Sequence, residues 1–416
     1  MKARRHLFLA LTRAGWGETA LGIRVAQQLQ HTGEEPFFLV HEAAGMLFRN
    51  GTIPFEEYSD KVGPFFEFLL DEQVTLQKPA SIILCDFLTT VDNLRLMGLS
   101  PDILSRYGIP IIAMDTWNFE ESGTGVDIFI GKTKPVSNWI AELPFRLAPV
   151  PFVRPQAKGA CSFLPAPVRL PQRIREHVRA GFGLSAHDRA VLICTANWQQ
   201  TVYNDDNGQR MAGAVPPLLG RYLAEFGPSV HVIHIGPTAF AFEGSLGERY
   251  HWMPSQTSER FQHVLGSVDL YLSLNVSATT MSTAIASGIP VVVVQNSCAA
   301  QNVDEACAWA TFPLSDRVRT WLEQTTPLYP FSMFPLGFFR FLAPVLVDNP
   351  YCQAFHTVEL LDEEGCKSTC NALLFDRGAR EALLQAQAQY TALVHKLPTA
   401  ANLVQSYLER GACSPR

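Results

Sequence analysis

Strand-like apolar runs that alternate with amphipathic segments are the feature that most constrains how this chain folds. The runs lie at 7–11, 37–40, 81–86, 109–115, 189–194, 230–235, 268–272 and 289–294. Segments with the apolar spacing of helices separate them, for example 18–30. Strands that are apolar along their whole length belong to parallel sheets with helices on both faces. The pattern therefore predicts an α/β fold with doubly wound, Rossmann-like parallel sheets.

A proline-rich stretch divides this alternation into two halves. Seven prolines fall between positions 144 and 171 with little periodicity, which is typical of a linker. A chain of 416 residues is also long for one core. The predicted layout is a first domain over 1–150, a linker over 151–175, a second domain over 176–375 with an aromatic insertion at 322–350, and a C-terminal helix over 376–416 that crosses back to the first domain. Two such domains would face a cleft at the carboxyl ends of their strands, where ligands bind.

Composition excludes several partner classes. The net charge is −6 and the positive residues are scattered, so no basic surface for nucleic acid is expected. No apolar run approaches the roughly 18 residues that a transmembrane helix needs, and the N-terminal run is too short for a signal peptide. Nine irregularly spaced cysteines indicate reduced thiols in a cytoplasmic protein. Cys366 and Cys370 share a helical face, but no second pair accompanies them, so no metal site is predicted.

Six short motifs follow one another in the second half of the chain. They are Leu192-Ile193-Cys194-Thr195, His234-Ile235-Gly236, Trp252-Met253-Pro254, Asp269-Leu270-Tyr271-Leu272, Asn275-Val276-Ser277-Ala278-Thr279-Thr280 and Ala284-Ile285-Ala286-Ser287-Gly288-Ile289-Pro290. In this order they resemble the nucleotide-sugar-binding half of glycosyltransferases of the GT-B fold. A glycine-rich first turn and the strand at 108–115 extend the resemblance to the first half. The chain is thus similar to a divergent member of that superfamily.

The resemblance implies a metal-independent glycosyltransferase without a cofactor. Its donor would be a nucleoside diphosphate sugar, above all a UDP-sugar, and its acceptor a small molecule, such as a natural product, or a peptide. The implied donor contacts are Thr195, Asn197, Trp198, Gly236, Trp252, Met253, Asn275, Ser277, Thr279, Thr280 and Thr283. The residue types agree, because hydroxyls and unpaired amides at a helix N-terminus bind phosphate well. Alternatively, Ser277 or Thr279 only caps that helix.

One departure from the family pattern concerns the ribose. Many relatives carry a glutamate five residues before the glycine of the last motif, where it binds the ribose hydroxyls. Here that position is Thr283, which cannot offer a bidentate carboxylate to a diol. The donor is therefore held differently, the nucleotide is unusual, or the site no longer serves a nucleotide sugar.

The glycine-rich first turn of the first domain would lie on the acceptor side. Gly15 and Gly17 would let the backbone approach a ligand closely. Relatives often carry a histidine there as general base, whereas this chain offers Glu18, with Asp115 at the end of a later strand as its rival. Alternatively, Glu18 complements the helix dipole and Asp115 caps the next segment.

Two other functions stay open at this point. One is a nucleotide-sugar epimerase or hydrolase of the same fold. The other is a non-catalytic relative that binds a partner, which Thr283 and the aromatic segment 328–344 motivate. That segment is interpreted either as a lid, an apolar acceptor surface or a homodimer contact, or as an irregular insertion buried in its domain.

Overall fold

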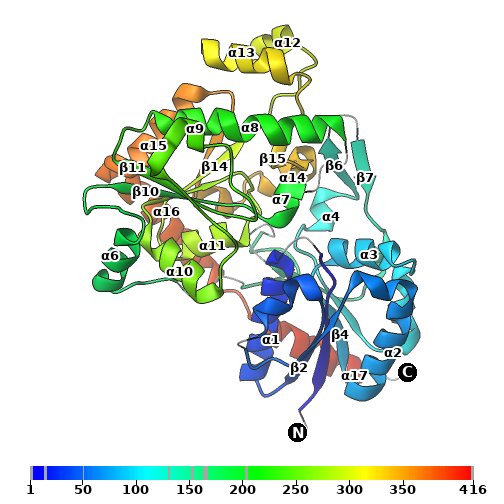
Figure 1. The fold of residues 1–416 in the computed structure, drawn as a ribbon. Helices are drawn as coiled ribbons and strands as arrows, with labels where there is room; N and C mark the ends of the chain where they lie inside the picture. Colours follow the sequence, from blue (N-terminus) through cyan, green and yellow to red (C-terminus); the bar gives the residue numbers. More distant parts are fainter. Residues whose placement is uncertain are drawn as a thin grey trace. The chain divides into compact units, whose positions relative to one another are not determined.

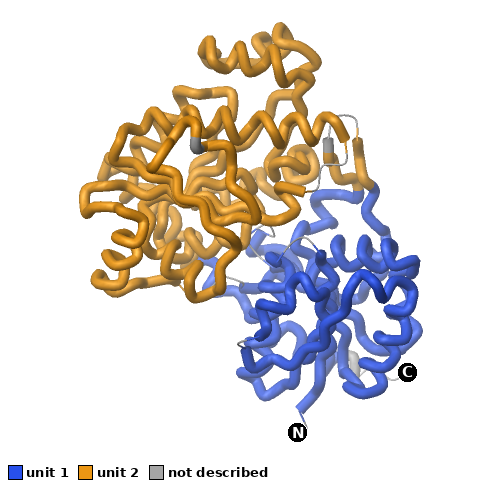
Figure 2. Tube along the Cα trace, in the orientation of Figure 1, with its two compact units in different colours: residues 1–124, 135–163, 393–416 blue, residues 125–134, 164–392 orange. Residues whose placement is uncertain are grey.

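The computed structural model describes residues 3–13, 16–49, 51–129, 132–149, 151, 154–162, 167–201 and 205–413, with the backbone alone for Phe129, Glu243 and 411–413. The chain forms two compact units (Figure 2). Unit 1 comprises Met1–Thr124, Pro135–Phe163 and Leu393–Arg416. Unit 2 comprises Gly125–Lys134 and Leu164–Ala392. Each unit therefore gathers segments that are far apart in the sequence.

Unit 1 is built on a seven-stranded sheet in the order β3-β2-β1-β4-β5-β8-β9 (Figure 1). Its strands are β1 Arg5–Ala10, β2 Glu35–His41, β3 Phe55–Tyr58, β4 Ser81–Leu84, β5 Ile111–Met114, β8 Arg146–Pro149 and β9 Ala160–Cys161. Every neighbouring pair is parallel. The strand order reverses between β1 and β4, which makes their carboxyl ends the ligand-binding position of such a sheet.

Unit 1 contains the following helices, and all but the last of them connect its strands. They are α1 Gly17–His31, η1 Glu42–Leu47, η2 Asp60–Phe65, α2 Phe66–Gln77, α3 Phe87–Leu96, η3 Pro101–Tyr107, α4 Phe119–Ser122, α5 Trp139–Glu142 and α17 Ala400–Cys413. At Gly22 of α1 a Cβ atom would lie 2.4 Å from Cys85 Sγ, so this helix packs directly on the end of β4. The amide of Ala400 donates to Gln28 Oε1 at 2.8 Å, which joins α17 to α1.

Unit 2 contains a six-stranded sheet in the order β12-β11-β10-β13-β14-β17. Its strands are β10 Arg189–Cys194, β11 Val230–Ile235, β12 Tyr250–Met253, β13 Leu270–Ser273, β14 Val291–Gln295 and β17 His356–Glu359. All neighbouring pairs are again parallel. The reversal of strand order lies between β10 and β13. The prediction of two doubly wound parallel sheets is confirmed.

The remaining elements, from α6 to α16, complete unit 2. The helices are α6 Gln172–Ala180, α7 Asn197–Thr201, α8 Asp206–Ala224, α9 Glu243–Leu246, η4 Gly247–Arg249, α10 Ser258–Ser267, α11 Thr279–Ala286, α12 Val303–Trp309, α13 Asp316–Thr325, α14 Phe339–Leu346, η5 Pro350–Gln353, α15 Glu363–Phe375 and α16 Arg377–Val394. Two small sheets are β6 Gly125–Phe129 with β7 Lys132–Pro135, and β15 Phe331–Met333 with β16 Gly337–Phe338. No helix in the described ranges is long and apolar enough to span a membrane.

The aromatic segment is buried in unit 2. Phe331 is 0% exposed and Phe334 is 2% exposed, and both belong to the main core of the unit. Phe338 and Phe341 are likewise buried. The segment is thus buried in its domain, as the second interpretation holds, but it is not irregular, because it forms β15, β16 and α14. Its role as a lid, an apolar acceptor surface or a homodimer contact stays a prediction.

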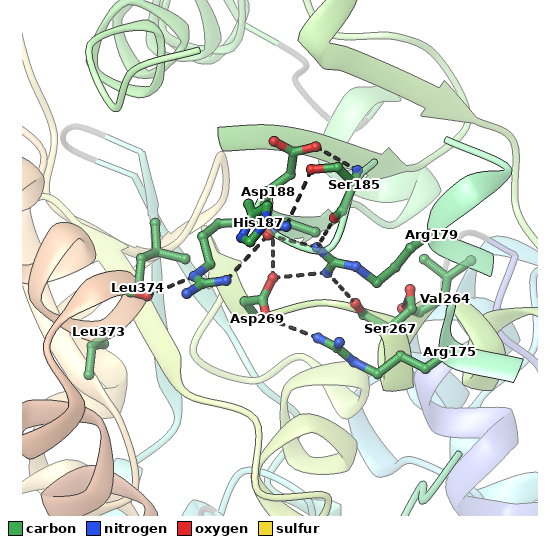
Figure 3. Close-up of polar contacts among 12 residues, drawn as sticks. Arg175, Arg179, Ser185, His187, Asp188, Val264, Ser267, Asp269, Leu373 and Leu374 are labelled. Atoms are coloured by element: carbon green, nitrogen blue, oxygen red, sulfur yellow. Dashed lines mark hydrogen bonds and ion pairs between the residues drawn. The ribbon is translucent and has the colours of Figure 1, made fainter. Parts of the chain in front are cut away.

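A buried ion-pair network holds the amino-terminal edge of the unit 2 sheet (Figure 3). Asp269 stands directly before β13, and its carboxylate accepts hydrogen bonds from Arg175 at 2.9 Å and from Arg179 at 3.1 Å. It also accepts the amide of Ala190 in β10 at 2.9 Å. The guanidinium of Arg179 is 6% exposed and donates further to backbone carbonyls, including that of Ser267 at 3.0 Å. The network thus joins α6 to the two central strands.

Candidate functional site

The predicted donor residues of unit 2 all lie at or next to the carboxyl edge of its sheet. Thr195, Asn197 and Trp198 follow β10, Gly236 follows β11, Trp252 and Met253 end β12, and Asn275, Ser277, Thr279, Thr280 and Thr283 follow β13. Because β10 and β13 flank the reversal of strand order, their following loops form the usual ligand position of this fold.

The loop between β13 and α11 presents an uncapped helix N-terminus. The side chain of Asn275 folds over the loop, and its Oδ1 accepts the amide of Ser277 at 2.9 Å and the hydroxyl of Ser277 at 2.7 Å. The N-cap residue of α11 is Ala278, which has no side-chain hydrogen bond to the helix. The alternative that Ser277 or Thr279 caps this helix is therefore wrong. Within the described residues, the amides of Thr279 and Thr280 have neither an intrahelical acceptor nor a side-chain cap, whereas the amide of Met281 donates to the carbonyl of Ala278 at 3.0 Å.

Two of the predicted donor residues point their hydroxyls at the protein itself. Thr280 Oγ1 lies 2.5 Å from the hydroxyl of Tyr271 in β13. Thr283 is 7% exposed, and its hydroxyl donates to the carbonyl of Thr279 at 3.1 Å. The hydroxyl of Thr283 is therefore bonded to the preceding turn of α11, and it does not replace the ribose-binding carboxylate of the relatives.

The aromatic segment is hydrogen-bonded to the loop between β13 and α11. The amide of Val276 donates to the carbonyl of Ser332 at 3.0 Å, and the amide of Phe334 donates to the carbonyl of Leu274 at 3.0 Å. The hydroxyl of Tyr351 donates to the carbonyl of Val276 at 3.1 Å. Two backbone hydrogen bonds and one from a side-chain hydroxyl thus fix the loop before any ligand arrives, which lowers the cost of ordering it on binding.

A histidine that the sequence analysis did not single out lies beside Thr195. His234 is fully buried in β11, and its Nε2 lies 2.8 Å from Thr195 Oγ1. Its Nδ1 lies 2.8 Å from the hydroxyl of Tyr250. Burial lowers the pKa of His234 to about 4, so the imidazole is neutral at physiological pH.

Trp252 offers an aromatic face at the same edge. Its indole N–H donates to the carbonyl of Gly236 at 3.0 Å, which fixes the ring, while 42% of the residue stays exposed. The carbonyl of Met253 accepts the amide of Gly236 at 3.2 Å. A fixed and exposed indole is suited to stack on a planar base.

In unit 1 three carboxyl groups gather at the carboxyl ends of the central strands. Glu18 lies in the first turn of α1 after β1, Asp86 follows β4, and Asp115 follows β5. Gly17 opens α1, whereas Gly15 lies outside the described residues. The indole N–H of Trp16, the N-cap residue, donates to the carbonyl of Ala43 at 3.0 Å and fixes the start of the helix.

Of these three carboxyl groups, Glu18 has an oxygen atom that is buried without a hydrogen-bond partner among the described residues. Its Oε2 is inaccessible to solvent and has no hydrogen-bond partner among the described residues. Burial and the nearby charge of Asp86 raise the pKa of Glu18 to about 7. A carboxyl group with this pKa exchanges a proton near neutral pH, as a general base must.

The carboxyl groups of Asp86 and Asp115 both have hydrogen-bond partners. Asp86 accepts the hydroxyl of Thr116 at 2.6 Å and the amide of Thr89 at 2.7 Å, while burial raises its pKa. Asp115 accepts the amide of Phe119 at 3.2 Å and faces the guanidinium of Arg146 at 3.4 Å. Burial raises the pKa of Asp115 to about 6. The capping role weighed for Asp115 is thus present.

Sequence reasoning missed Asp86 and His234 although both carry a signal. Asp86 ends an apolar run in the same way as Asp115 does, so the end of that strand deserved equal weight. His234 is a titratable residue inside an otherwise apolar strand, which indicates a buried polar partner.

Metal-ligand clusters are absent from the described part of the chain. It holds no group of three or more His, Cys, Asp or Glu side chains arranged to bind a metal ion. Cys366 and Cys370 lie buried on α15 and, like the other cysteines with described side chains, are free thiols.

Comparisons with known proteins agree with the fold. A family model described as "Family of unknown function (DUF6365)" matches residues 25–413, and no curated protein matches the sequence. Among solved structures, the chain is similar to a glycosyltransferase from Rickettsia africae ESF-5, at 9% identity and a TM-score of 0.56, with 100% of each chain covered.

Two further structures show the same likeness. One is Anabaena Alr3699/HepE in complex with UDP and glucose, at 12% identity and a TM-score of 0.56, with 99% of this chain and 100% of that chain covered. The other is the spinosyn forosaminyltransferase SpnP, at 14% identity and a TM-score of 0.56, with 98% and 99% covered. At these identities the likeness establishes the fold, and the predicted resemblance to GT-B glycosyltransferases is confirmed at that level.

Proposed function

We propose that this chain, which belongs to the DUF6365 family of unknown function, is a metal-independent glycosyltransferase that uses a nucleoside diphosphate sugar. The observation that carries the proposal is the uncapped N-terminus of α11 at the strand-order reversal of unit 2. The diphosphate would accept hydrogen bonds from the amides of Thr279 and Thr280, and the helix dipole would stabilise its charge. The fold shared with known glycosyltransferases supports this reading.

The proposed donor site has contacts for the base and for the phosphates. The indole of Trp252 would stack on the base, and Ser277 and Thr279 would lie beside the phosphates. The Anabaena structure is a complex with UDP and glucose, which favours UDP as the first nucleotide to test. Because Thr283 is turned onto its own helix, the ribose would be held by other groups than in the resembled family.

At the acceptor end, Glu18 would act as the general base. Its carboxylate would take the proton of the acceptor hydroxyl or amine as that atom bonds to the anomeric carbon of the sugar. The bond from that carbon to the phosphate oxygen would break, and its electron pair would leave with the nucleoside diphosphate beside α11. Asp115 is the alternative base, but its contacts with Phe119 and Arg146 favour a supporting role.

The pH dependence of transfer follows from this assignment. A base works only when deprotonated, and the pKa of Glu18 is raised to about 7. Below that pH, kcat/KM should fall about tenfold per pH unit, and above it kcat/KM should level off. A steady-state profile from pH 5.5 to 9 at saturating donor measures this. A profile that is flat across pH 6–8 would exclude Glu18 as the base.

A thermal-shift screen tests donor binding without knowledge of the acceptor. UDP, GDP, ADP, CMP and dTDP, each with its common sugars, are added to the full chain. A ligand that binds only the folded state stabilises it by about 2.7 kcal/mol at a hundredfold excess over Kd. We expect UDP to raise the melting temperature, also in the presence of EDTA. The variant Ser277→Ala with Thr279→Val should show a smaller response, because it removes the hydroxyls beside the phosphates and keeps the backbone amides.

A matched control removes a hydroxyl elsewhere in the same unit. Thr325 lies in α13 and donates only within its helix, to the carbonyl of Trp321 at 2.7 Å, so Thr325→Val should keep the response to UDP. No stabilisation of the wild-type chain by any nucleotide would contradict the proposal. That outcome would favour a non-catalytic GT-B protein, in which the threonine at position 283 marks a lost donor site.

A further inference from the structure

The three carboxyl groups of unit 1 lie at the ends of strands that are direct neighbours. Glu18, Asp86 and Asp115 follow β1, β4 and β5, and β4 pairs with both of the other strands. Asp86 accepts the hydroxyl of Thr116, the residue directly after Asp115, at 2.6 Å. The ends of β4 and β5 are thus hydrogen-bonded to each other.

The packing of α1 brings Glu18 to the same place. A Cβ atom at Gly22 would lie 2.4 Å from Cys85 Sγ, so this face of α1 contacts the residue before Asp86. Glu18 lies four residues before Gly22 and therefore shares its face of the helix. Burial and then the charge of Asp86 raise the pKa of Glu18, which agrees with this placement.

Little positive charge balances these carboxyl groups. Arg146 lies 3.4 Å from Asp115, but it also pairs with Glu120 at 3.1 Å. Neither Glu18 nor Asp86 forms an ion pair with a lysine or arginine within the described ranges. A cation bound beside them would favour their ionised forms.

A second observation concerns hydrogen bonds and is independent of charge. On α1 and α3, which begin beside Glu18 and Asp86, four buried side-chain atoms have no hydrogen-bond partner among the described residues, and all four are oxygens. They are Glu18 Oε2, Thr19 Oγ1, Thr90 Oγ1 and Asn93 Oδ1. Thr19, Thr90 and Asn93 are 0%, 1% and 7% exposed.

The two residues of α3 lie on the side of the helix that Asp86 begins. Thr90 and Asn93 follow Asp86 by four and seven residues, which is the spacing of one helical face. Nδ2 of Asn93 donates to the carbonyl of Thr89 at 2.8 Å, so the amide orientation is fixed and Oδ1 is an acceptor. In the loop after β5, Asn118 adds a buried amide donor that carries no charge. Beside α1 and α3, buried acceptors therefore lack donors, which is costly unless a ligand supplies them.

We propose that the acceptor of this chain carries a protonated amine, which binds between Glu18 and Asp86 and beside the unpartnered oxygens of α3. The inference rests on the proposed function, because it assumes that the acceptor binds at this edge of unit 1. An ammonium group has three N–H donors and one positive charge. A hydroxyl has one donor and no charge, and an anion would be repelled by the carboxylates.

The amine would also prepare the proposed general base. A positive charge beside a carboxyl group lowers its pKa. Glu18, with a pKa of about 7 in the free chain, would therefore lose its proton when the amine binds. The ionised form that results is the one that can accept a proton from the acceptor.

Calorimetry on the full chain with saturating UDP tests the proposal with matched pairs of probes. The pairs are benzylamine with benzyl alcohol, scyllo-inosamine with scyllo-inositol, and putrescine with 1,4-butanediol. In at least one pair the amine should bind about tenfold or more tightly than the alcohol, the usual gain for hydrogen bonds between charged groups. Equal binding within every pair, or binding of none of the six probes, would overturn the inference.

Three variants locate the bound amine. Asp86→Asn and Glu18→Gln keep the size of the side chain and remove its charge, so each should reduce the preference for the amine about tenfold. Glu72→Gln is the matched control, because Glu72 is an exposed residue of α2 in the same unit, and it should keep the preference. An undiminished preference in both Asp86→Asn and Glu18→Gln would place the amine elsewhere and overturn the inference.

Proton release from the wild-type chain covers the case in which a variant does not fold. At pH 6.5 Glu18 is mostly protonated, because its pKa is about 7. Binding of the preferred amine should therefore release a fraction of a proton, which calorimetry in two buffers of different heats of ionisation measures. Amine binding without proton release would contradict the placement beside Glu18.

The binding of UDP alone separates this inference from the proposed function. If the wild-type chain binds UDP but shows no preference for an amine, the inference fails and the proposed function stands. If it binds none of UDP, GDP, ADP, CMP and dTDP, the proposed function is rejected and this inference with it.

Discussion

Replacing Glu18 with glutamine is expected to lower the rate of sugar transfer by about a hundredfold to ten-thousandfold, the usual contribution of a general base. The amide keeps the size of the side chain and cannot take a proton. Glu18 differs from Asp86 and Asp115 because its Oε2 has no hydrogen-bond partner among the described residues and its pKa is raised to about 7. Turnover at pH 8 with saturating donor measures the effect, once the donor screen has named the nucleotide.

The stability of Glu18→Gln shows whether a loss of turnover comes from unfolding. Because the pKa of Glu18 is raised from 4.5 to about 7, the folded state binds more protons than the unfolded state in this window, and stability falls as the pH rises through it. Glu18→Gln removes that slope, so the variant should be no less stable than the wild type at pH 8. Full turnover in Glu18→Gln together with lost turnover in Asp115→Asn would assign the base to Asp115 instead.

Replacing Asp269 with alanine is expected to lower the free energy of unfolding of unit 2 by about 3–5 kcal/mol, the usual cost of leaving a buried charge without its partner. The variant leaves the guanidinium of Arg179, which is 6% exposed, without its carboxylate. It also removes the acceptor of the Ala190 amide in the central strand β10. Urea unfolding followed by tryptophan fluorescence measures the loss.

An exposed ion pair in the same unit serves as the comparison for Asp269. Glu381 and Arg377 pair across one turn of α16, and their side chains are 61% and 89% exposed. Glu381→Ala should therefore change the stability by well under about 1 kcal/mol. Equal effects of Asp269→Ala and Glu381→Ala would show that the network of Figure 3 does not support the sheet.

Much of the fold follows from local sequence, because strands buried on both faces are apolar along their whole length. The run at 7–11 and the runs at 189–194 and 291–294 are strands for this reason. The prediction fails where a strand is not buried. The apolar spacing at 57–74 predicts a helix, but β3 extends to Tyr58, η2 follows it, and α2 begins only at Phe66. The edge strand β3 carries charged residues and therefore resembles a helix in composition. The C-terminal helix predicted over 376–416 is likewise two helices, α16 and α17.

The sequence predicts at which strand ends the candidate site lies. It does not predict which residues contact one another there. The order of motifs places Thr195 and Ser277 at the correct strand ends, since carboxyl ends of parallel strands share one edge. The support of the loop by Ser332 comes from more than fifty residues away, and no local pattern encodes it. For the same reason the charge of Asp86 beside Glu18 becomes visible only when β1 and β4 are neighbours.

Hydrogen exchange with and without UDP tests the central claim most directly, that a nucleoside diphosphate binds at the start of α11. We expect UDP to slow exchange in peptides that cover 194–201 and 274–283, and to leave peptides from β3 and α2 unchanged. Slowed exchange only in other segments, or no change at saturating UDP and the other nucleoside diphosphates, would contradict the account.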